Sequence, residues 1–322
     1  MRGFVRLNSR RSKTIKRDMD KKIAAIVVTY NRKELLAECL AAICAQEYKP
    51  AAVYVVDNAS TDGTSEWITA NGYDREKEGI LFHYVLLPEN IGGAGGFYTG
   101  LKMAHESEEN FDAFWLMDDD GVADKNQLAN LAKHLDTHDF LSPMVIAKED
   151  SSYCAFYNYT VEEFVRQSVN GLIANKADSF NGVLYTRKLI DKVGYPIKDM
   201  FIWGDEVNFD VRCINAGFTP AIVVNAIHTH PKDRQVRVKL YKSNLPVPTP
   251  NWKLYVYVRN VIFNSVSLAD RRYKIFTRTY RILREYAYYF IFVEPSLEKL
   301  KIVCCAVYDG FNKDLTHLAN YK

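Results

Sequence analysis

The stretch IAAIVVTYNRKELLAECLAAIC, residues 23–44, contains the unit from which the fold is built. Its first seven residues are all apolar or β-branched, which is typical of a parallel strand buried on both faces. After a short polar turn, Leu36, Leu40 and Ile43 recur at helical spacing within residues 33–45. A buried strand that leads into such a helix is half of a βαβ unit, so this stretch predicts a parallel sheet covered by helices.

The same pattern repeats downstream. Residues 51–57, 80–87 and 113–117 are further apolar strand candidates, and helical patterns follow residue 60 and span 95–108. Strands and helices that alternate through short connections predict a doubly wound sheet. In such sheets ligands bind beyond the carboxyl ends of the strands, so polar residues at those ends are the candidates for function.

The second half of the chain is less regular. Residues 140–146 and 179–194 predict a strand and a strand followed by a short helix, whereas 148–177 is polar and remains unassigned. Long helical patterns begin at about residue 251, after a proline-rich stretch. The expected division is a disordered basic arm at 1–20, an α/β domain at 21–245 and a helical region at 246–322 that contacts a membrane surface or a second subunit.

Composition limits the protein class. Of the 322 residues, 48% are hydrophobic and 25% charged, and the net charge of +3 is too small to indicate nucleic acid as a partner. Six cysteines without a CxxC pair fit a reducing cytosol, and the longest C-terminal apolar run, 286–293, is far short of the roughly 20 residues that span a bilayer. We therefore expect a cytoplasmic protein; basic clusters at 1–17 and 232–242 leave peripheral contact with an anionic membrane open.

Two strand ends carry residues suited to a nucleotide. Thr29, Tyr30 and Arg32 could hold a nucleobase and a phosphate, or they could merely form a polar helix cap. Asp57 could accept hydrogen bonds from a base or ribose, although lone carboxylates at such positions are often caps. The glycine-rich turn at 89–100 would let backbone N–H groups approach an anion, but it matches neither GxGxxG nor a Walker motif.

An acidic triplet ends the strand WLMDDDG at residues 115–121. Asp118 and Asp120 can point to the same side of an extended turn and share one divalent cation. Oxygen ligands suit Mg²⁺ or Mn²⁺, and such ions are usually shared with a substrate's phosphates. The alternative is a solvated acidic loop.

Two later segments offer a base and further ligands. Asp205 and Glu206 follow the apolar residues of FIWGDE, so a carboxylate there can be desolvated enough to act as a general base. The alternative is that both acids only favour the start of a helix. His228 and His230 could complete a metal shell or be structural.

Together these segments resemble the inverting glycosyltransferases of family two, whose fold is called GT-A. The resemblance rests on VVTYNR, VVDNASTDGT, WLMDDDG, WGDE and a following histidine, in this order, over about residues 22–230. ENIGGAGGF followed by MDDD narrows it toward bacterial galactofuranosyltransferases and related rhamnosyltransferases. LYVYVRN (254–260) and YDGFNKD (308–314) resemble their helical C-terminal region. Residues 1–18 match nothing in the family, so Met19 is an alternative start. The implied fold class is α/β, a Rossmann-like mixed sheet with a helical C-terminal region.

The resemblance also implies roles for individual residues. Asp205 matches the catalytic base, Glu206 its acidic neighbour, and Trp203 the aromatic residue that lines the acceptor site. Asp118 and Asp120 match the metal-binding DxD pair, with His228 as third ligand and His230 as runner-up. The implied donor-binding residues are Thr29, Tyr30, Arg32, Asp57, Asn58, Asn90, Gly92, Gly93, Asp118 and Asp119.

The resulting hypothesis is an inverting hexosyltransferase that uses Mn²⁺ or Mg²⁺. Its expected donor is UDP-galactofuranose, and its acceptor is a sugar hydroxyl of a growing, lipid-linked bacterial surface glycan such as O-antigen or capsule. A rhamnosyltransferase using a dTDP-sugar is the alternative within the family. A metal-dependent phosphohydrolase or nucleotidyltransferase and a non-catalytic sugar-nucleotide-binding protein are the alternatives outside it. Expected partners are the donor, the glycan or glycolipid acceptor, the cytoplasmic face of the inner membrane and a second copy of the chain.

Overall fold

The computed structural model describes residues 21–232, 237–240, 243–268 and 275–322. The chain forms two compact units. The first comprises the described residues up to Tyr195 together with Cys213–Lys232, and the second comprises Pro196–Arg212 and the described residues after 232. The sequence places the boundary at 245 instead, and the basic arm at 1–20 lies outside the described residues.

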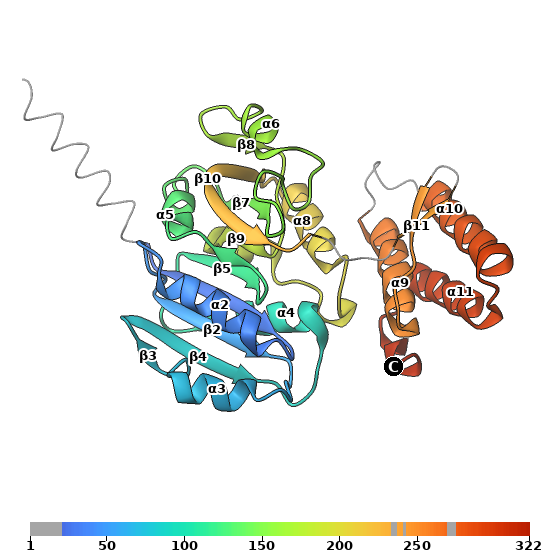
Figure 1. Ribbon diagram of the computed structural model, residues 1–322, viewed down its shortest axis with the longest axis horizontal. Helices are drawn as coiled ribbons and strands as arrows, with labels where there is room; N and C mark the ends of the chain where they lie inside the picture. The colour runs from blue at the N-terminus through green and yellow to red at the C-terminus, as the bar shows by residue number, and fades with distance from the viewer. Residues whose placement is uncertain (1–20, 233–236, 241–242, 269–274) are drawn as a thin grey trace, which may run out of the picture. The chain divides into compact units, whose positions relative to one another are not determined.

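The first unit is built on one mixed sheet (Figure 1). Its strands are β1 (Ile23–Thr29), β2 (Ala52–Asp57), β3 (Glu76–Lys77), β4 (Ile80–Leu86), β5 (Ala113–Asp118), β6 (Val122–Ala123), β7 (Phe140–Ala147), β8 (Leu172–Ala174), β9 (Asn181–Thr186) and β10 (Ala221–His230). They lie in the order β3-β4-β2-β1-β5-β9-β7-β10-β6, with β8 also paired to β10. Strands β4, β2, β1 and β5 are parallel, and β9 is antiparallel to β5 and β7.

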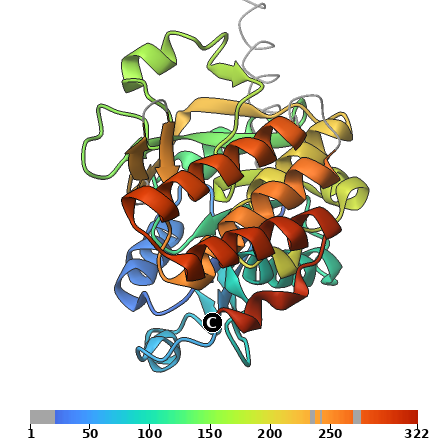
Figure 2. The ribbon, with the colours of Figure 1, turned by 90° about the vertical axis from the view of Figure 1, so that its right-hand side faces the viewer.

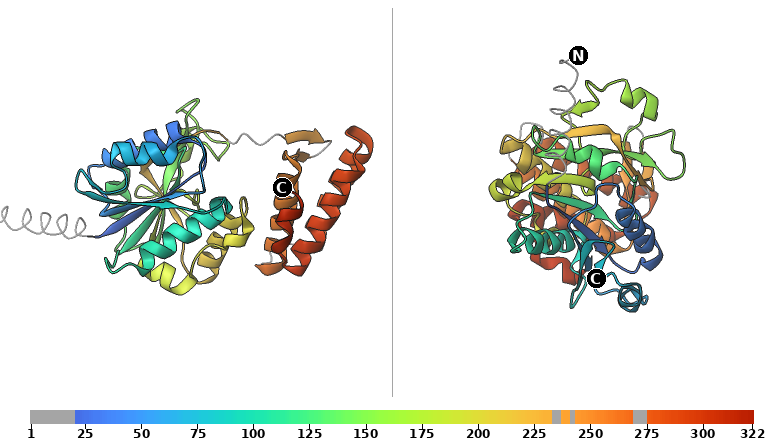
Figure 3. Two further views of the ribbon diagram at one scale, coloured as in Figure 1. Left: turned by 90° about the horizontal axis from the view of Figure 1, so that it is seen from below. Right: turned by 90° about the vertical axis from the view of Figure 1, so that its left-hand side faces the viewer.

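Helices cover both faces of this sheet, as the left view of Figure 3 shows. They are α2 (Lys33–Cys44), α3 (Thr64–Asn71), α4 (Gly92–Glu106), α5 (Gln127–Ala132), α6 (Val161–Val165) and α7 (Arg187–Val193). Val27 of β1 is buried in one cluster with Leu36 and Leu40 of α2. On the other face Gly96 of α4 lies against Val28, where an added Cβ would come within 2.5 Å of a methyl group. The apolar strand and the amphipathic helix predicted at 23–44 are thus confirmed, and so is the mixed α/β sheet.

The carboxyl ends of four strands meet at one edge of the sheet. Because β9 runs antiparallel to both neighbours, β7 runs in the same direction as β5, and β10 is parallel to β7. Thr29, Asp57, Asp118 and His230 are the last residues of β1, β2, β5 and β10. The residues that the sequence singles out at strand ends therefore share this edge.

A two-residue strand brings the acidic turn to the histidines. β6 follows the turn at 118–121 and pairs antiparallel with β10, so that Ala123 lies opposite His228 and Val122 opposite Thr229. The short strand has no periodicity of its own, so the sequence does not reveal it.

The second unit contains a helical cluster, shown in Figure 2. Its helices are η1 (Lys198–Met200), the first turns of α8 (Asp205–Asn215), α9 (Asn251–Ser267), α10 (Ile275–Tyr288), η2 (Tyr289–Val293), α11 (Leu297–Asn312) and η3 (Thr316–Asn320), with a hairpin of β11 (Arg237–Leu240) and β12 (Ser243–Pro246). Val258 and Ile262 of α9 share a buried cluster with Val303 and Ala306 of α11. The predicted helical C-terminal region is confirmed. Within the described residues, every helix is too short or too polar to cross a bilayer.

Candidate active site

The first side chains of the site are tied together at the end of β1. The Thr29 hydroxyl donates to Asp119 Oδ2 at 2.7 Å, and Arg32 Nη1 lies 3.1 Å from both Asp119 Oδ1 and Asp120 Oδ2. Asp119 is buried, with 2% of its surface exposed. Both of its oxygens therefore have partners within the protein.

The three carboxylates stand in unequal electrostatic environments. Burial, followed by the charges of Asp120 and Asp119, raises the pKa of Asp118 to about 8. Burial also raises the pKa of Asp119 to about 6, although Arg32 opposes the shift. For Asp120, His230 and Arg32 outweigh burial and lower the pKa. A divalent cation at this turn would favour the ionised form of all three groups.

The two predicted histidines have different surroundings. His230 Nε2 lies 3.1 Å from Asp120 Oδ1, and its Nδ1 lies 2.6 Å from the carbonyl oxygen of Pro231. Burial acts to lower the pKa of His230, but its bond to Asp120 prevails and raises it. His230 therefore contacts the acidic triplet directly.

His228 is fully buried beside the turn. Its Nδ1 lies 3.0 Å from Gln127 Oε1, and burial lowers its pKa to about 3, so the ring is neutral. Its Nε2 forms no hydrogen bond with any described residue. A Cβ added to Gly121 would lie only 2.1 Å from Nε2, and one added to Gly182 would lie 2.9 Å from Nδ1. The ring thus fills the space that two glycines leave, and Nε2 faces Gly121.

The end of β2 forms a second, mostly preorganised group. Asp57 Oδ1 accepts from the Ser60 backbone N–H at 2.8 Å, and Oδ2 accepts from the Tyr84 hydroxyl at 2.6 Å. Asn58 is buried, and its Oδ1 has no hydrogen-bond partner among the described residues. Tyr30 by contrast is 43% exposed at the end of β1, where its ring is open to stacking. Sequence reasoning missed Tyr84, which carries no signal beyond its place in a strand.

The glycine-rich turn is ordered by a hydrogen bond and by packing within the protein. Asn90 Oδ1 accepts from the Gly92 N–H at 2.8 Å and so orders the start of α4. A Cβ at Gly95 would come within 2.6 Å of Ile91. A Cβ at Gly93, in contrast, would meet nothing within 4 Å. Gly93 therefore has open space beside it, whereas Gly95 does not.

Asp205 lies in the second unit at the start of α8. It is buried, with 4% of its surface exposed, as the desolvation argument from sequence anticipates. Glu206 Oε2 accepts from the Gly204 N–H at 2.8 Å, so Glu206 closes the turn before the helix. The Trp203 ring lies edge-on to Tyr257, with ring centroids 6.4 Å apart. Sequence reasoning missed the asparagines of α9 that contact this turn.

The predicted metal ligands are not gathered around one point. Within the described part of the chain, the three side chains whose ligand atoms all lie within 4.8 Å of one another are Asp309, Asp314 and His317 of the second unit. At the acidic turn the guanidinium of Arg32 bridges Asp119 and Asp120 instead. The donor set of oxygens and imidazole nitrogen fits Mn²⁺ or Mg²⁺, with side-chain rotations needed to close the shell.

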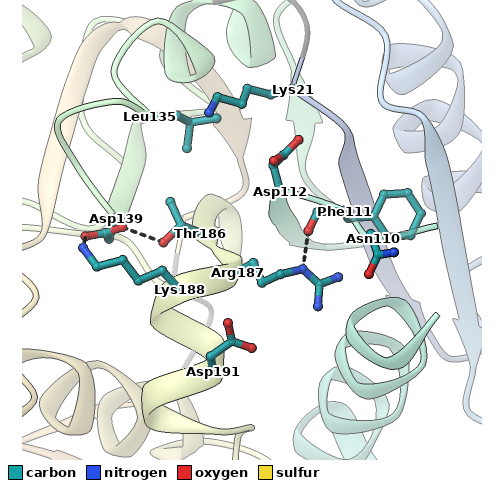
Figure 4. A pocket seen from close by; sticks show the side chains of 10 residues that line it. All are labelled: Lys21, Asn110, Phe111, Asp112, Leu135, Asp139, Thr186, Arg187, Lys188 and Asp191. Atoms are coloured by element: carbon teal, nitrogen blue, oxygen red, sulfur yellow. Dashed lines mark hydrogen bonds and ion pairs between the residues drawn. The ribbon is translucent and has the colours of Figure 1, made fainter. Parts of the chain in front are cut away.

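A pocket of about 410 Å³ lies elsewhere in the first unit (Figure 4). Asp112 and Asp139, which line it, precede β5 and β7, so the pocket is at the amino-end edge of the parallel strands. Dashed lines in Figure 4 show Asp139 holding Thr186 and Lys188. None of the residues predicted for the site lines this pocket.

Comparisons with known proteins identify the family of this chain. The family model described as Glycosyl transferase family 2 matches residues 24–192. Galactofuranosyltransferase GlfT1 of Mycolicibacterium smegmatis is 33% identical over 222 residues, which are 65% of this chain and 70% of the relative. GlfT1 of Mycobacterium tuberculosis is 31% identical over 223 residues, 66% of this chain and 71% of the relative. The crystal structure of S. aureus TarS 1-349 in complex with UDP-GlcNAc has a TM-score of 0.56 at 17% identity, covering 90% of this chain and 80% of that one, which is a likeness of fold.

Proposed function

Because this chain belongs to glycosyl transferase family 2 and is a glycosyltransferase of GT-A fold, we propose that it transfers galactofuranose from UDP-galactofuranose, with inversion, to a sugar hydroxyl. The donor follows from the two GlfT1 relatives, which are named galactofuranosyltransferases and match about two thirds of this chain. The observation that carries the proposal is the acidic turn at the carboxyl edge of the sheet, bonded to Thr29, Arg32 and His230.

The residues of the first unit would bind the donor. The exposed ring of Tyr30 would stack on the uracil, and Asp57, held by Tyr84, would accept hydrogen bonds from the nucleoside. Asn58, Asn90, Gly92 and Gly93 would lie along the diphosphate. In the present structure Arg32 forms ion pairs with both Asp119 and Asp120. A bound diphosphate would compete for that guanidinium, which binds phosphate oxygens well.

We assign the metal to Asp118, Asp120 and His230. His230 already contacts Asp120, whereas Nε2 of His228 faces Gly121 and could reach a ligand only after the turn moves. We therefore prefer His230 over His228 as the imidazole ligand, and His228 as a packing residue. When bound, Mn²⁺ or Mg²⁺ would stabilise the negative charge on the departing diphosphate.

Asp205 is the proposed general base. Its carboxylate would take the proton of the acceptor hydroxyl, whose oxygen then attacks the anomeric carbon from the face opposite the nucleotide. One displacement forms the new glycosidic bond and breaks the bond to UDP, so configuration inverts and no covalent intermediate is required. Glu206 supports the turn, and Trp203 would contact the acceptor sugar.

The test is nucleoside-diphosphate release across a panel of donors with a synthetic lipid-linked sugar acceptor and Mn²⁺ or Mg²⁺. The panel contains UDP-galactofuranose formed in situ from UDP-galactopyranose, UDP-galactopyranose alone, UDP-glucose and dTDP-rhamnose. Release only with the furanose, lost in Asp205→Ala and on chelation, supports the proposal. Turnover of dTDP-rhamnose alone would replace the donor, and release of phosphate without glycan extension would indicate a hydrolase.

A lipid-linked acceptor implies work at a membrane surface, and one helix is suited to it. Exposed aromatic residues occupy positions 276, 280, 288 and 292 along α10 and η2, with Phe276 83% and Phe292 72% exposed. Arg281 and Arg284 are exposed on the same helix. An aromatic and basic stripe of this kind binds the interface of anionic membranes. We therefore propose peripheral binding to the cytoplasmic face of the inner membrane, tested by flotation with anionic and neutral vesicles. Self-association in place of vesicle binding would indicate a subunit interface.

A further inference from the structure

The turn that precedes Asp205 has an unfavourable backbone. Phe201, Trp203 and Gly204 have φ angles of +72°, +57° and +89°. A residue other than glycine in this region costs of the order of 1–3 kcal/mol and persists only where its surroundings hold it. Two of the four residues immediately before Asp205 are of this kind, so something must hold the turn.

Asn260 on helix α9 holds three carbonyl groups of this turn. The two hydrogens of its side-chain amide nitrogen are shared among three backbone oxygens, those of Met200 at 2.9 Å, Ile202 at 2.9 Å and Trp203 at 2.7 Å. Asn260 itself is buried. Buried carbonyls outside regular structure need a donor, and here one side chain supplies it for most of the turn.

Asn264 extends the same contact by one helical turn. Its amide nitrogen donates to the Gly204 carbonyl at 2.7 Å, and its oxygen accepts from Asn208 Nδ2 at 2.9 Å. Gly204 directly precedes Asp205, and Asn208 lies in the first turn of α8. Asn264 thus bonds to the backbone directly before Asp205 and to a side chain three residues after it.

Arg259 fixes the orientation of Asn260. Its Nε donates to Asn260 Oδ1 at 3.0 Å, so the amide nitrogen must face the turn, and its Nη2 donates to the Met200 carbonyl at 3.0 Å. The guanidinium is fully buried, and burial lowers its pKa. Buried charges and asparagines inside a helix are both unfavourable unless their hydrogen bonds are made. These contacts give the three polar side chains a reason to occupy an otherwise apolar face of α9.

We propose that Asn260, oriented by Arg259, and Asn264 are positioning residues that set the direction of the Asp205 carboxylate. The inference rests on the proposed role of Asp205 as general base. A catalytic group displaced by about 1 Å can lose a factor of 10² in rate. Removing the N–H groups of these asparagines should therefore reduce kcat. Binding of the sugar nucleotide by the first unit should be unchanged.

The experiment compares Asn260→Asp and Asn264→Ala with Asn251→Asp, each measured by UDP release. Asn260→Asp keeps the size of the side chain and the acceptor for Arg259 but removes the N–H donors. Asn251 is on the same helix and bonds Glu298, so Asn251→Asp is the matched control. We expect a 10- to 100-fold lower kcat for Asn260→Asp, less for Asn264→Ala, and less than a twofold change in KM for the donor. Amide exchange of residues 201–205 should accelerate in both variants and not in the control.

The background of Asp205→Ala separates positioning from general damage. If Asn260 acts through Asp205, adding Asn260→Asp to Asp205→Ala should leave the residual rate unchanged within twofold. A multiplied loss would refute the inference, as would unchanged kcat and exchange in both single variants. If Asp205→Ala alone keeps full activity, the base assignment fails, while faster exchange at 201–205 still shows that the asparagines hold the turn. If Asn260→Asp does not fold, Asn264→Ala is combined with Asp205→Ala in its place, and the same outcomes apply.

Discussion

The substitution Gly121→Ala tests how tightly the acidic turn is packed against His228. A Cβ at this position would lie 2.1 Å from Nε2 and 2.9 Å from Cε1 of the ring. Ordinary contacts lie near 3.5 Å, so about 1.4 Å of movement is required. The ring cannot provide it, because Gly182 and the bond to Gln127 close its other side. The movement therefore falls on the turn at 118–121. Gly121 has no positive φ, so the cost comes from this contact alone.

We expect Gly121→Ala to lower the free energy of unfolding by about 1–3 kcal/mol, as overpacking of a buried site does. For a unit of this size that lowers Tm by about 2–4 °C per kcal/mol. UDP release should fall as well, because the triplet is displaced. The measurements are urea unfolding followed by circular dichroism, and activity at saturating Mn²⁺. Gly93→Ala is the control for stability, since nothing lies within 4 Å of a Cβ there.

A double-mutant cycle makes the argument specific. His228→Ala alone removes the ring and its bond to Gln127, which should cost about 2–4 kcal/mol. Gly121→Ala together with His228→Ala should cost at least about 1 kcal/mol less than the sum of the single changes, because the added methyl group then enters vacated space. Additive costs, or a Gly121→Ala protein as stable as the wild type, would refute the packing argument.

Three further changes test other parts of the structure. Tyr84→Phe removes the hydroxyl that donates to Asp57 Oδ2, so the free energy of unfolding in urea should fall by about 1 kcal/mol. The KM for the sugar nucleotide should rise several-fold. An unchanged KM would show that Asp57 does not contribute to binding of the sugar nucleotide. Gly310→Ala places a Cβ 2.7 Å from the backbone oxygen of Arg259, so α9 and α11 must separate, and Tm should fall well below that of Gly93→Ala. Burial raises the pKa of Cys154 to about 11, so little of its thiolate is present at pH 8. Iodoacetamide should therefore alkylate the exposed Cys304 and Cys305 before Cys154, as followed by mass spectrometry. Equal rates of alkylation at the three cysteines would contradict the burial of Cys154.

The elements that the sequence predicts correctly are those in which the apolar pattern continues over many residues. The buried strand β1 and the helix α2 show apolar spacing over seven and twelve residues, and both lie where expected. β3 and β6 have two residues each and exist only through pairing with a neighbour. The polar segment at 148–177 forms α6 and β8, which are stabilised by a small separate cluster around Phe164.

The candidate site shows the same limit. Thr29 and the acidic triplet are visible in the sequence because they follow apolar strands. The ion pairs of Arg32 with Asp119 and Asp120 join residues 87 and 88 positions apart, and no local pattern reports them. Asn260 meets its turn across 57–60 positions. An asparagine within an apolar helix indicates that its amide has hydrogen-bond partners, but the tertiary fold alone determines which residues these are.

The glycines of α4 bear on the order in which the chain folds. Five of the fifteen residues of this helix are glycine, at positions 92, 93, 95, 96 and 100. Each lowers intrinsic helix stability by about 1 kcal/mol relative to alanine, so the isolated segment has little tendency to be helical. Two of these glycines, Gly96 and Gly100, allow close contact with β1 and β2, so these strands must pair first to offer a surface. α4 should form late, after the transition state of folding. Under native conditions it should unfold locally before the strands of the sheet do. The turn at Asn90, which begins this helix, would then be the segment of the donor-binding residues whose local stability increases most when a ligand binds.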